Sequence, residues 1–252
     1  MSEQLQRRAA VLGASARGGV GWCAAEILAE DGFRVHAGAR TRAGLEELAH
    51  ETGAQFSCCD ATNETDIALY AQRAAEEGKL DVAILAAGVG VQGEIASIAE
   101  DRLRAAFELS FFAGVYFIRH IAPHIKPGGA IILVSTIAAH TPWPGYFAYG
   151  CAKSALETLT AYAALEYGPK RVRINAIRPG PLITPGFENA ASRTPGLQAA
   201  MTSETPLGEM TRPEHAARLA VWLAEAESVT GVCVPVDGGL HLRRPPDLPA
   251  RR

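Results

Sequence analysis

The sequence predicts an α/β fold of the Rossmann type, a doubly wound parallel sheet of about seven strands with helices on both faces. Short apolar runs alternate with longer amphipathic segments along most of the 252 residues, and this alternation indicates βαβ units. The first apolar run leads into a glycine-rich turn and then a helix, an arrangement that can bind a phosphate group. Because no linker or repeat interrupts the pattern, we expect one nucleotide-binding domain over residues 1–252.

Each element follows from its local pattern. We expect strands at residues 9–12, 33–38, 54–59, 82–87, 130–135, 172–177 and 232–236. We expect helices at residues 22–30, 42–51, 64–77, 100–125 and 213–224, and a further helix that carries Tyr149. The Lys-Pro-Gly-Gly sequence at 126–129 predicts a turn. Pro235 cannot donate a ladder hydrogen bond, so the last strand is expected at a sheet edge.

Two segments are expected to lie outside this regular pattern. Residues 184–207 have few periodic apolar positions, and a loop of that length is typical of a substrate-binding lid. Residues 242–252 are rich in Pro and Arg and are expected to form an exposed tail.

Composition favours a cytoplasmic protein with a small-molecule partner. The chain has 48% hydrophobic and 20% charged residues, and its net charge of −3 argues against a nucleic-acid surface. No signal-peptide pattern and no apolar run of membrane-spanning length is recognisable, so we expect no membrane contact. The five cysteines show no metal-binding or disulfide spacing, so we expect no metal and reduced thiols.

The residues after the second expected strand bear on the choice of cofactor. An acidic residue there would bind the ribose 2′-hydroxyl of NAD, whereas an arginine nearby would accept the 2′-phosphate of NADP. The chain has Ala39 followed by Arg40, and Arg17 and Arg42 could add positive charge. NADP(H) is therefore preferred, with NAD(H) possible.

Tyr149 and Lys153 form the candidate acid–base pair. Residues four apart share one face of a helix, so the phenol and the ammonium are expected to point into the same cleft. A cation beside a phenol stabilises the phenolate and brings its proton exchange toward neutral pH. Thr136 lies thirteen residues before the tyrosine. The spacing alone also fits two residues that merely share a helix.

In the order and spacing of these motifs, residues 8 to 240 resemble the short-chain dehydrogenase/reductase family. The resemblance implies an oxidoreductase in which Tyr149, Lys153 and Thr136 carry the chemistry, with Ser110 at the position of a water-holding asparagine. It implies cofactor contacts from a set of residues at the carboxyl ends of the strands. These are Gly13, Ser15, Arg17, Gly19, Val20, Gly21, Arg40, Asp60, Ala61, Ala87, Gly88, Tyr149, Lys153, Pro179, Gly180, Leu182 and Thr184. Asn175 also falls in a stretch that lines the nicotinamide side in this family.

The sequence departs from the family pattern at several positions. Five residues separate Gly13 from Gly19 where the family has three, which predicts a larger phosphate loop. Ala86 and Ser110 stand where the family has asparagines, and Thr136 replaces its serine. Ser135 is adjacent, but neighbouring strand residues face opposite sides, so we expect only one of the two hydroxyls to serve the cleft.

The leading hypothesis is reversible hydride transfer between NADP(H) and a carbonyl or secondary alcohol, with Tyr149 exchanging the proton. Aromatic residues near the expected cleft suggest a small cyclic or apolar substrate; with Thr136, the candidate contacts are Trp143, Tyr146 and Phe187. Non-redox chemistry at the same site (isomerisation, cyclisation or elimination) and a non-catalytic nucleotide sensor remain as alternatives. The alanine-rich Tyr149 helix and the resemblance suggest a homo-oligomer, either a dimer or a tetramer.

Overall fold

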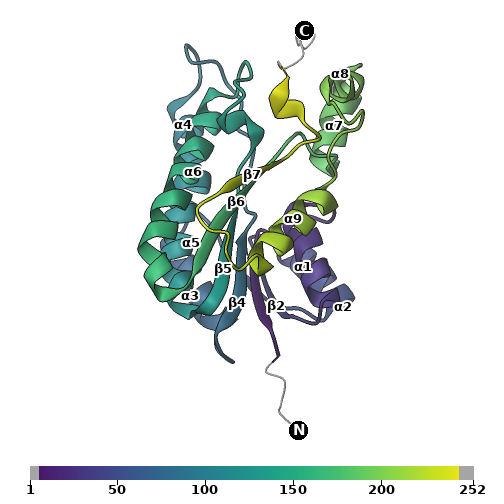
Figure 1. Cartoon of the computed structure of the whole chain (residues 1–252). Helices are drawn as coiled ribbons and strands as arrows, with labels where there is room; N and C mark the ends of the chain where they lie inside the picture. The colour runs from purple at the N-terminus through teal and green to yellow at the C-terminus, as the bar shows by residue number, and fades with distance from the viewer. Residues whose placement is uncertain (1–5, 244–252) are drawn as a thin grey trace.

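A seven-stranded, fully parallel sheet forms the centre of the computed structural model, which describes residues 6–243 (Figure 1). The strand order is β3-β2-β1-β4-β5-β6-β7. The strands are β1 (Arg8–Leu12), β2 (Arg34–Ala39), β3 (Gln55–Cys58), β4 (Leu80–Leu85), β5 (Ile125–Val134), β6 (Arg173–Pro179) and β7 (Cys233–Val236). The central strands are apolar on both faces because helices cover both sides. This confirms the predicted fold class, and β7, which contains Pro235, is an edge strand as expected.

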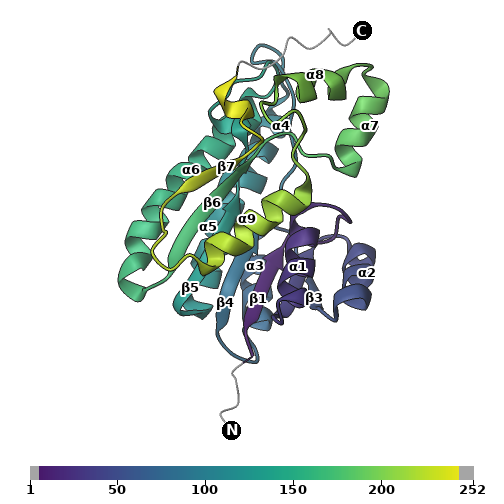
Figure 2. The same ribbon diagram turned by 45° about the vertical axis from the view of Figure 1, so that its right-hand side comes forward.

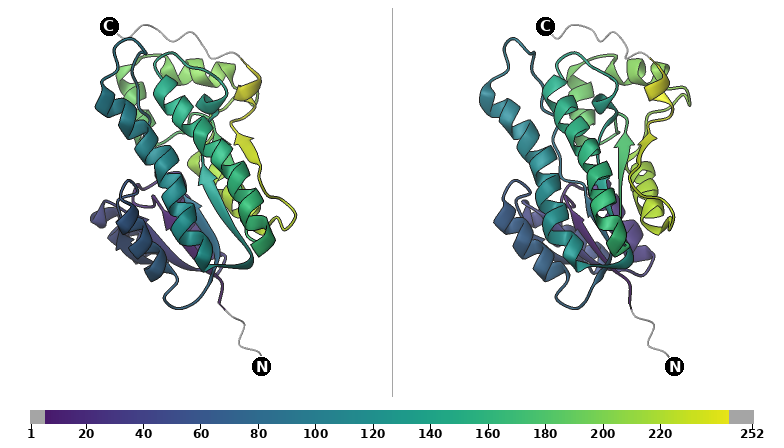
Figure 3. Two further views of the ribbon diagram at one scale, coloured as in Figure 1. Left: turned by 90° about the vertical axis from the view of Figure 1, so that its left-hand side faces the viewer. Right: turned by 60° about the vertical axis from the view of Figure 1, so that its left-hand side comes forward.

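Two helical layers enclose the sheet (Figures 2 and 3). Val11 and Leu12 illustrate the arrangement, because these neighbours on β1 are fully buried in different cores on opposite faces. The core of Val11 includes residues of α1 (Val20–Glu30), α2 (Arg42–Thr52) and α9 (Pro213–Glu225). The core of Leu12 includes residues of α3 (Glu64–Ala74), α5 (Ala113–Ile121) and α6 (Phe147–Tyr167). The carboxyl ends of all seven strands therefore meet at one edge of the sheet.

The helix expected at residues 100–125 is interrupted in the structure. It comprises α4 (Glu100–Phe107), a π-helical turn η1 (Glu108–Phe112), α5 and the 3₁₀ turn η2 (Ala122–His124). By length and composition, the whole stretch Glu100–His124 is apolar enough to cross a membrane, although we expected no such segment. Within the described fold it packs against α3 and α6, and a core helix of a globular domain passes the same test.

Two further expectations are wrong in detail. Residues 126–129 belong to β5 instead of forming a separate turn, and the pairing of β5 with β4 shifts register between Leu80 and Val82. The segment 184–207 is not a long loop, because it contains α7 (Pro185–Arg193) and α8 (Leu197–Glu204). Both helices lie beyond the carboxyl edge of the sheet (Figures 1 and 2). Of the expected tail, Leu242 and Arg243 are exposed, and 244–252 lie outside the described residues.

Arg173 joins the lower part of the sheet to the end of α9. Its side chain is 8% exposed, and its guanidinium donates four hydrogen bonds of 2.6 to 3.2 Å. The acceptors are the backbone carbonyls of Leu223, Ala224, Ala226 and Gly128. Three of these carbonyls lie at the C-terminal end of α9, where helix carbonyls have no partner within the helix. The cation therefore satisfies them and also complements the negative end of the helix dipole.

We predict that Arg173→Met lowers the free energy of unfolding by about 2 kcal/mol or more, because buried carbonyls lose charged donors. Chemical denaturation followed by circular dichroism measures this change. Arg218→Met is the matched control, since Arg218 lies exposed on α9 itself. Equal stability of the two variants would show that the Arg173 hydrogen bonds contribute nothing.

Candidate active site

Tyr149, Lys153 and Thr136 meet at the carboxyl edge of the sheet, where β5 ends beside α6. Lys153 is 3% exposed, and its Nζ donates a 2.8 Å hydrogen bond to the carbonyl of Val134, the last residue of β5. The ammonium also lies 5.9 Å from the centroid of the Tyr149 ring. The structure thus brings the expected pair together on one helix face.

Gly150, between Tyr149 and Lys153, allows α6 to pack closely on the segment that follows β5. A Cβ atom on Gly150 would lie only 2.6 Å from the carbonyl oxygen of Ala138, which belongs to the 3₁₀ turn η3 (Ile137–Ala139) after β5. Ser154 donates a 2.8 Å hydrogen bond from its hydroxyl to the carbonyl of Ala139. The first turns of α6 therefore pack directly on the segment that carries Thr136.

Burial dominates the protonation of the pair. It raises the pKa of Tyr149 to about 12, although hydrogen bonding to the Thr136 side chain acts in the opposite direction. Burial lowers the pKa of Lys153 to about 8, while the negative charge of Glu157 partly offsets this effect. In this structure the pKa of the phenol is therefore shifted away from neutrality, opposite to the direction expected from a neighbouring lysine. At neutral pH the phenol is protonated and the amine is charged.

Thr136, and not Ser135, supplies the hydroxyl beside Tyr149. Its Oγ1 accepts a 3.3 Å hydrogen bond from the amide of Ala138, which fixes the side chain at the start of η3. The hydroxyl of Ser135 donates instead to Glu157 at 2.6 Å. Both side chains contact α6, Thr136 at Tyr149 and Ser135 at Glu157. Only the Thr136 hydroxyl therefore lies beside the acid–base pair, which agrees with the expectation that one of the two serves the cleft. The reason is that the two side chains meet different turns of the helix, and not that neighbouring strand residues face opposite sides.

Ser110 lies within the π-helical turn η1 and is 3% exposed. The turn packs against α6, and single π-turns inside helices are often found at functional sites. The π-turn thus places Ser110 near the acid–base helix, as the sequence comparison required.

The expected phosphate loop connects β1 to α1. Gly13 has φ of 102°, and a Cβ atom there would lie 2.3 Å from the amide nitrogen of Ala87, so no other residue fits. Gly19 precedes α1, and the start of this helix has no side-chain cap. Its first N–H groups are therefore available to a phosphate. Ser15, Val20 and Gly21 lie in the same loop and first helical turn.

The three candidate arginines are in different situations. Arg17 pairs with Glu47 and Glu51 of α2, and Arg42 pairs with Glu46 at 2.8 Å. Arg40 is exposed and, within the described part of the chain, forms no ion pair shorter than 4.0 Å. Arg40 is therefore the cation available at the end of β2.

The turn after β3 holds Asp60 in a fixed orientation. Its Oδ1 accepts hydrogen bonds from the amide of Thr62 at 2.9 Å and from the Thr62 hydroxyl at 2.8 Å. Burial acts against ionisation, but these bonds and the charge of Arg40 lower the pKa of Asp60. Ala61, the next residue, is buried. The carboxylate thus lies near enough to Arg40, the candidate for the 2′-phosphate, for the two charges to interact.

The remaining candidate cofactor residues follow the carboxyl ends of β4 and β6. A Cβ atom on Gly88 would lie 3.6 Å from Lys153 Nζ, and Ala87 precedes it. Pro179 ends β6, and the amide of Gly180 bonds to the carbonyl of Val236 on β7. Beyond them, the chain continues through Leu182, which bridges to Thr211, and Thr184, whose hydroxyl caps α7.

Asn175 has a structural role that differs from the expected one. It lies in the middle of β6, is fully buried, and bonds to the backbone of Val229 and Val232 at 2.8 and 3.2 Å. These contacts hold the loop that precedes β7. Asn175 is therefore wrongly placed among the residues that line the nicotinamide.

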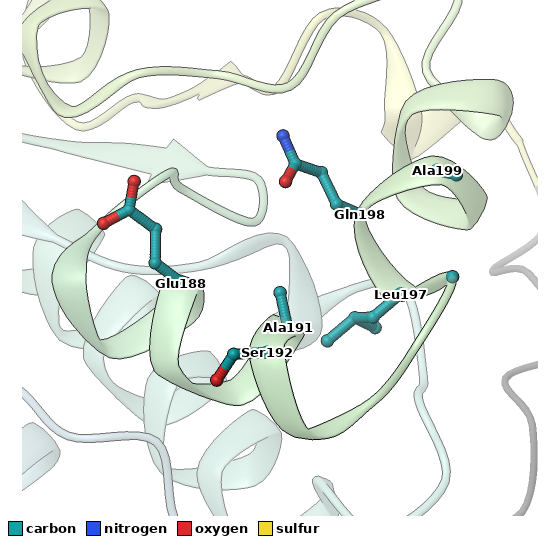
Figure 4. A pocket seen from close by; sticks show the side chains of 7 residues that line it. Glu188, Ala191, Ser192, Leu197, Gln198 and Ala199 are labelled. Atoms are coloured by element: carbon teal, nitrogen blue, oxygen red, sulfur yellow. The ribbon is translucent and has the colours of Figure 1, made fainter.

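The aromatic substrate candidates lie in or near the segment 184–207, and Phe187 is part of its first helix, α7. Trp143 and Phe187 pack on a cluster of Leu197, Met201 and Met210, and Tyr146 accepts a hydrogen bond from Gln92. A pocket of about 490 Å³ lies between α7 and α8. Figure 4 shows Glu188 and Gln198 projecting on the same side of this pocket. Because Tyr149, Lys153 and Thr136 do not line it, the pocket belongs to the α7–α8 segment and does not define the reaction site.

The parallel sheet, the phosphate loop and the Tyr149/Lys153 pair define a Rossmann-type fold with a site at its carboxyl edge. A family model described as enoyl-(acyl carrier protein) reductase matches residues 13–241. The chain is 32% identical to 2,5-dichloro-2,5-cyclohexadiene-1,4-diol dehydrogenase of Sphingobium indicum, over 88% of this chain and 92% of the relative.

Solved structures agree with these sequence matches. A short-chain type dehydrogenase/reductase from Mycobacterium ulcerans superimposes with a TM-score of 0.90 and 29% identity, covering 96% of this chain and 92% of its own. The structure of BdcA in complex with NADPH matches with a TM-score of 0.84 and 26% identity, covering 96% of each chain. The chain belongs to the short-chain dehydrogenase/reductase family and is an oxidoreductase.

Two charged residues next to this site, one on α6 and one on β6, were not predicted from the sequence. Glu157, buried one helical turn beyond Lys153, forms an ion pair with the half-buried Arg178 of β6. A charged residue four positions after Lys153, on the helix face that packs on the sheet, was the available signal for Glu157. Nothing in the sequence pairs it with Arg178, because the two residues belong to different elements.

Proposed function

We propose that the protein transfers a hydride between NADP(H) and the carbonyl or secondary alcohol of a small cyclic or apolar substrate, with Tyr149 as general acid and base. The convergence of Tyr149, Lys153 and Thr136 at the end of β5 is the observation that supports this most strongly. The Sphingobium relative is named as a dehydrogenase of a cyclic diol, which agrees with a cyclic substrate. The fold alone would not support it, since one fold serves many reactions.

The residues of the chain can carry the proton steps. Since the pKa of Tyr149 is raised to about 12, the phenol is protonated at neutral pH and can donate to a carbonyl oxygen. The Thr136 hydroxyl is placed to hydrogen-bond the same oxygen, and the charged Lys153 stabilises the phenolate that forms. The nicotinamide cofactor, when bound, supplies the hydride. In the oxidative direction the phenolate form of Tyr149, which the charged Lys153 stabilises, accepts the proton from the alcohol.

The segment 184–207, with α7 and α8, is proposed as the substrate-binding lid of a single domain. The packing of Trp143 on Leu197 and Met201 of this segment supports that role, because it joins the segment to the loop before Tyr149. A homo-oligomeric, cytoplasmic protein fits this proposal.

We predict that Tyr149→Phe lowers turnover by about two orders of magnitude or more, because the acid that donates the proton is lost. NADPH affinity should remain close to that of the wild type. Steady-state assays against a panel of cyclic ketones, with fluorescence titration of NADPH, measure both quantities. Tyr162→Phe is the control, since Tyr162 is an exposed tyrosine on α6. A Tyr149→Phe enzyme with normal turnover would exclude the assigned acid.

We infer that Arg40 binds the 2′-phosphate and gives the preference for NADP(H). Arg17 and Arg42 are occupied by glutamates, whereas Arg40 lies at the end of β2 near Asp60. The NADPH complex of BdcA supports this cofactor by similarity.

We predict that Arg40→Ala weakens NADPH binding about tenfold or more, because a charge-assisted hydrogen bond is lost, and leaves NADH binding unchanged. Titration calorimetry with both cofactors measures the difference. Arg42→Ala serves as the control two residues further along. If the wild type binds NADH more tightly than NADPH, the proposed preference is wrong.

A further inference from the structure

We propose that Glu157 is a positioning residue of the active site, which holds the ends of β5 and β6 in place beside Lys153 and Thr136 and puts a negative charge one helical turn from the lysine. This residue lies on the face of α6 that already carries the acid–base pair, since Tyr149, Lys153 and Glu157 follow one another at intervals of four. Its side chain is 7% exposed. A buried carboxylate is costly unless several donors compensate it, and the structure provides them.

Glu157 gathers donors from three separate elements. Ser135 at the end of β5 donates to Oε1 at 2.6 Å, and His140 after η3 lies with Nε2 2.8 Å from Oε2. Arg178 of β6 makes a two-pronged contact, with Nε 2.9 Å from Oε1 and Nη2 2.5 Å from Oε2. Such paired contacts fix orientation as well as charge. The carboxylate therefore ties both strand ends to α6.

The ends of these strands are the parts of the site that must stay in register. Ser135 lies between Val134, whose carbonyl accepts the Lys153 hydrogen bond, and Thr136 of the acid–base site. Arg178 directly precedes Pro179 and Gly180 of the candidate nicotinamide loop. By holding Ser135 and Arg178 together, Glu157 fixes the spacing between Thr136, after β5, and the candidate cofactor residues Pro179 and Gly180, at the end of β6.

The charges around Glu157 give it an electrostatic role as well. Burial alone would raise the pKa of Glu157, but hydrogen bonds from Arg178, Ser135 and His140 lower it, so the group is a carboxylate at neutral pH. The thiol of Cys233 on β7 also faces it, and burial together with the charge of Glu157 raises the pKa of that thiol to about 11. Lys153, whose pKa is lowered by its own burial, is held charged by the nearby carboxylate.

Glu157→Gln keeps the shape of the side chain and removes its charge. An effect in the folded variant therefore reports the orienting and electrostatic roles of Glu157 and not a failure to fold. The chain has four lysines, Lys79, Lys126, Lys153 and Lys170, and ¹³C-labelled lysine therefore gives four side-chain NMR signals, with Lys153 assigned by Lys153→Arg. We expect Lys153 to titrate at a lower pH in Glu157→Gln than in the wild type, because its ammonium loses a stabilising charge. Glu166→Gln, an exposed position on α6, should titrate as the wild type does.

Turnover gives a second readout, which rests on the proposed function. We expect Glu157→Gln to lower kcat about tenfold or more with little change in NADPH affinity, since misplaced reacting groups slow the chemical step. The alkaline limb of its pH–rate profile should move to lower pH, in the same direction as the lysine titration. A wild type without turnover would refute the proposed function and leave the NMR comparison intact.

The same titration of Lys153 in folded Glu157→Gln and in the wild type would overturn the inference. If Glu157→Gln fails to fold, Ser135→Ala decides, because it removes one donor and leaves the ion pair with Arg178. It should lower kcat about tenfold at normal thermal stability and NADPH affinity. Normal kcat in folded Ser135→Ala would then overturn the inference.

Discussion

The junction between the carboxyl end of β5 and one face of α6 is the contact on which the active site depends. Three consecutive residues of the strand end engage three successive turns of the helix. The carbonyl of Val134 accepts from Lys153, the hydroxyl of Ser135 donates to Glu157, and Thr136 lies beside Tyr149. Because positions four apart share a helix face, one straight helix presents all three partners at once. The close approach requires a glycine at position 150.

This junction also explains the protonation of the site. The helix and strand bury Lys153 and shield much of Tyr149 from water, and this desolvation disfavours the charged form of each. The phenol is consequently a stable proton donor, and the lysine becomes sensitive to any nearby charge. The carboxylate of Glu157 is the negative group one turn away, compensated in turn by Arg178. Lys153, Glu157 and Arg178 thus carry alternating charges beside the reacting groups.

Much of the fold follows from the sequence because the signals are local. Alternating apolar runs and helices predicted the seven parallel strands. Pro235, which cannot donate a ladder hydrogen bond, predicted that β7 is an edge strand. Helical periodicity placed Tyr149 and Lys153 on one face. The glycine-rich turn after the first strand also had a local signature, and the structure places Gly13, with a positive φ, at the end of β1.

The missed features depend on contacts between distant segments. Helices α7 and α8 bury their few apolar residues against Trp143 and Met210, so their own periodicity was weak. The π-turn around Ser110 interrupts a helix whose sequence reads as continuous. Asn175 looked like a cofactor residue from its position in the family pattern, yet it bonds to the loop before β7. The raised pKa of Tyr149 could not be predicted from spacing, because it reflects how deeply the surrounding elements bury the ring.

Transfer of label from deuterated NADPH tests the central claim most directly. The protein is incubated with a cyclic ketone and NADPH that carries deuterium at C4 of the nicotinamide, on each face in turn. Mass spectrometry and NMR of the product then locate the label. Our account predicts deuterium on the carbinol carbon of the alcohol from one face only, and none with Tyr149→Phe in the same period. If the substrate is converted to an unlabelled product with both forms of labelled NADPH, while the NADPH remains unoxidised, the result would contradict hydride transfer. It would indicate non-redox chemistry at this site.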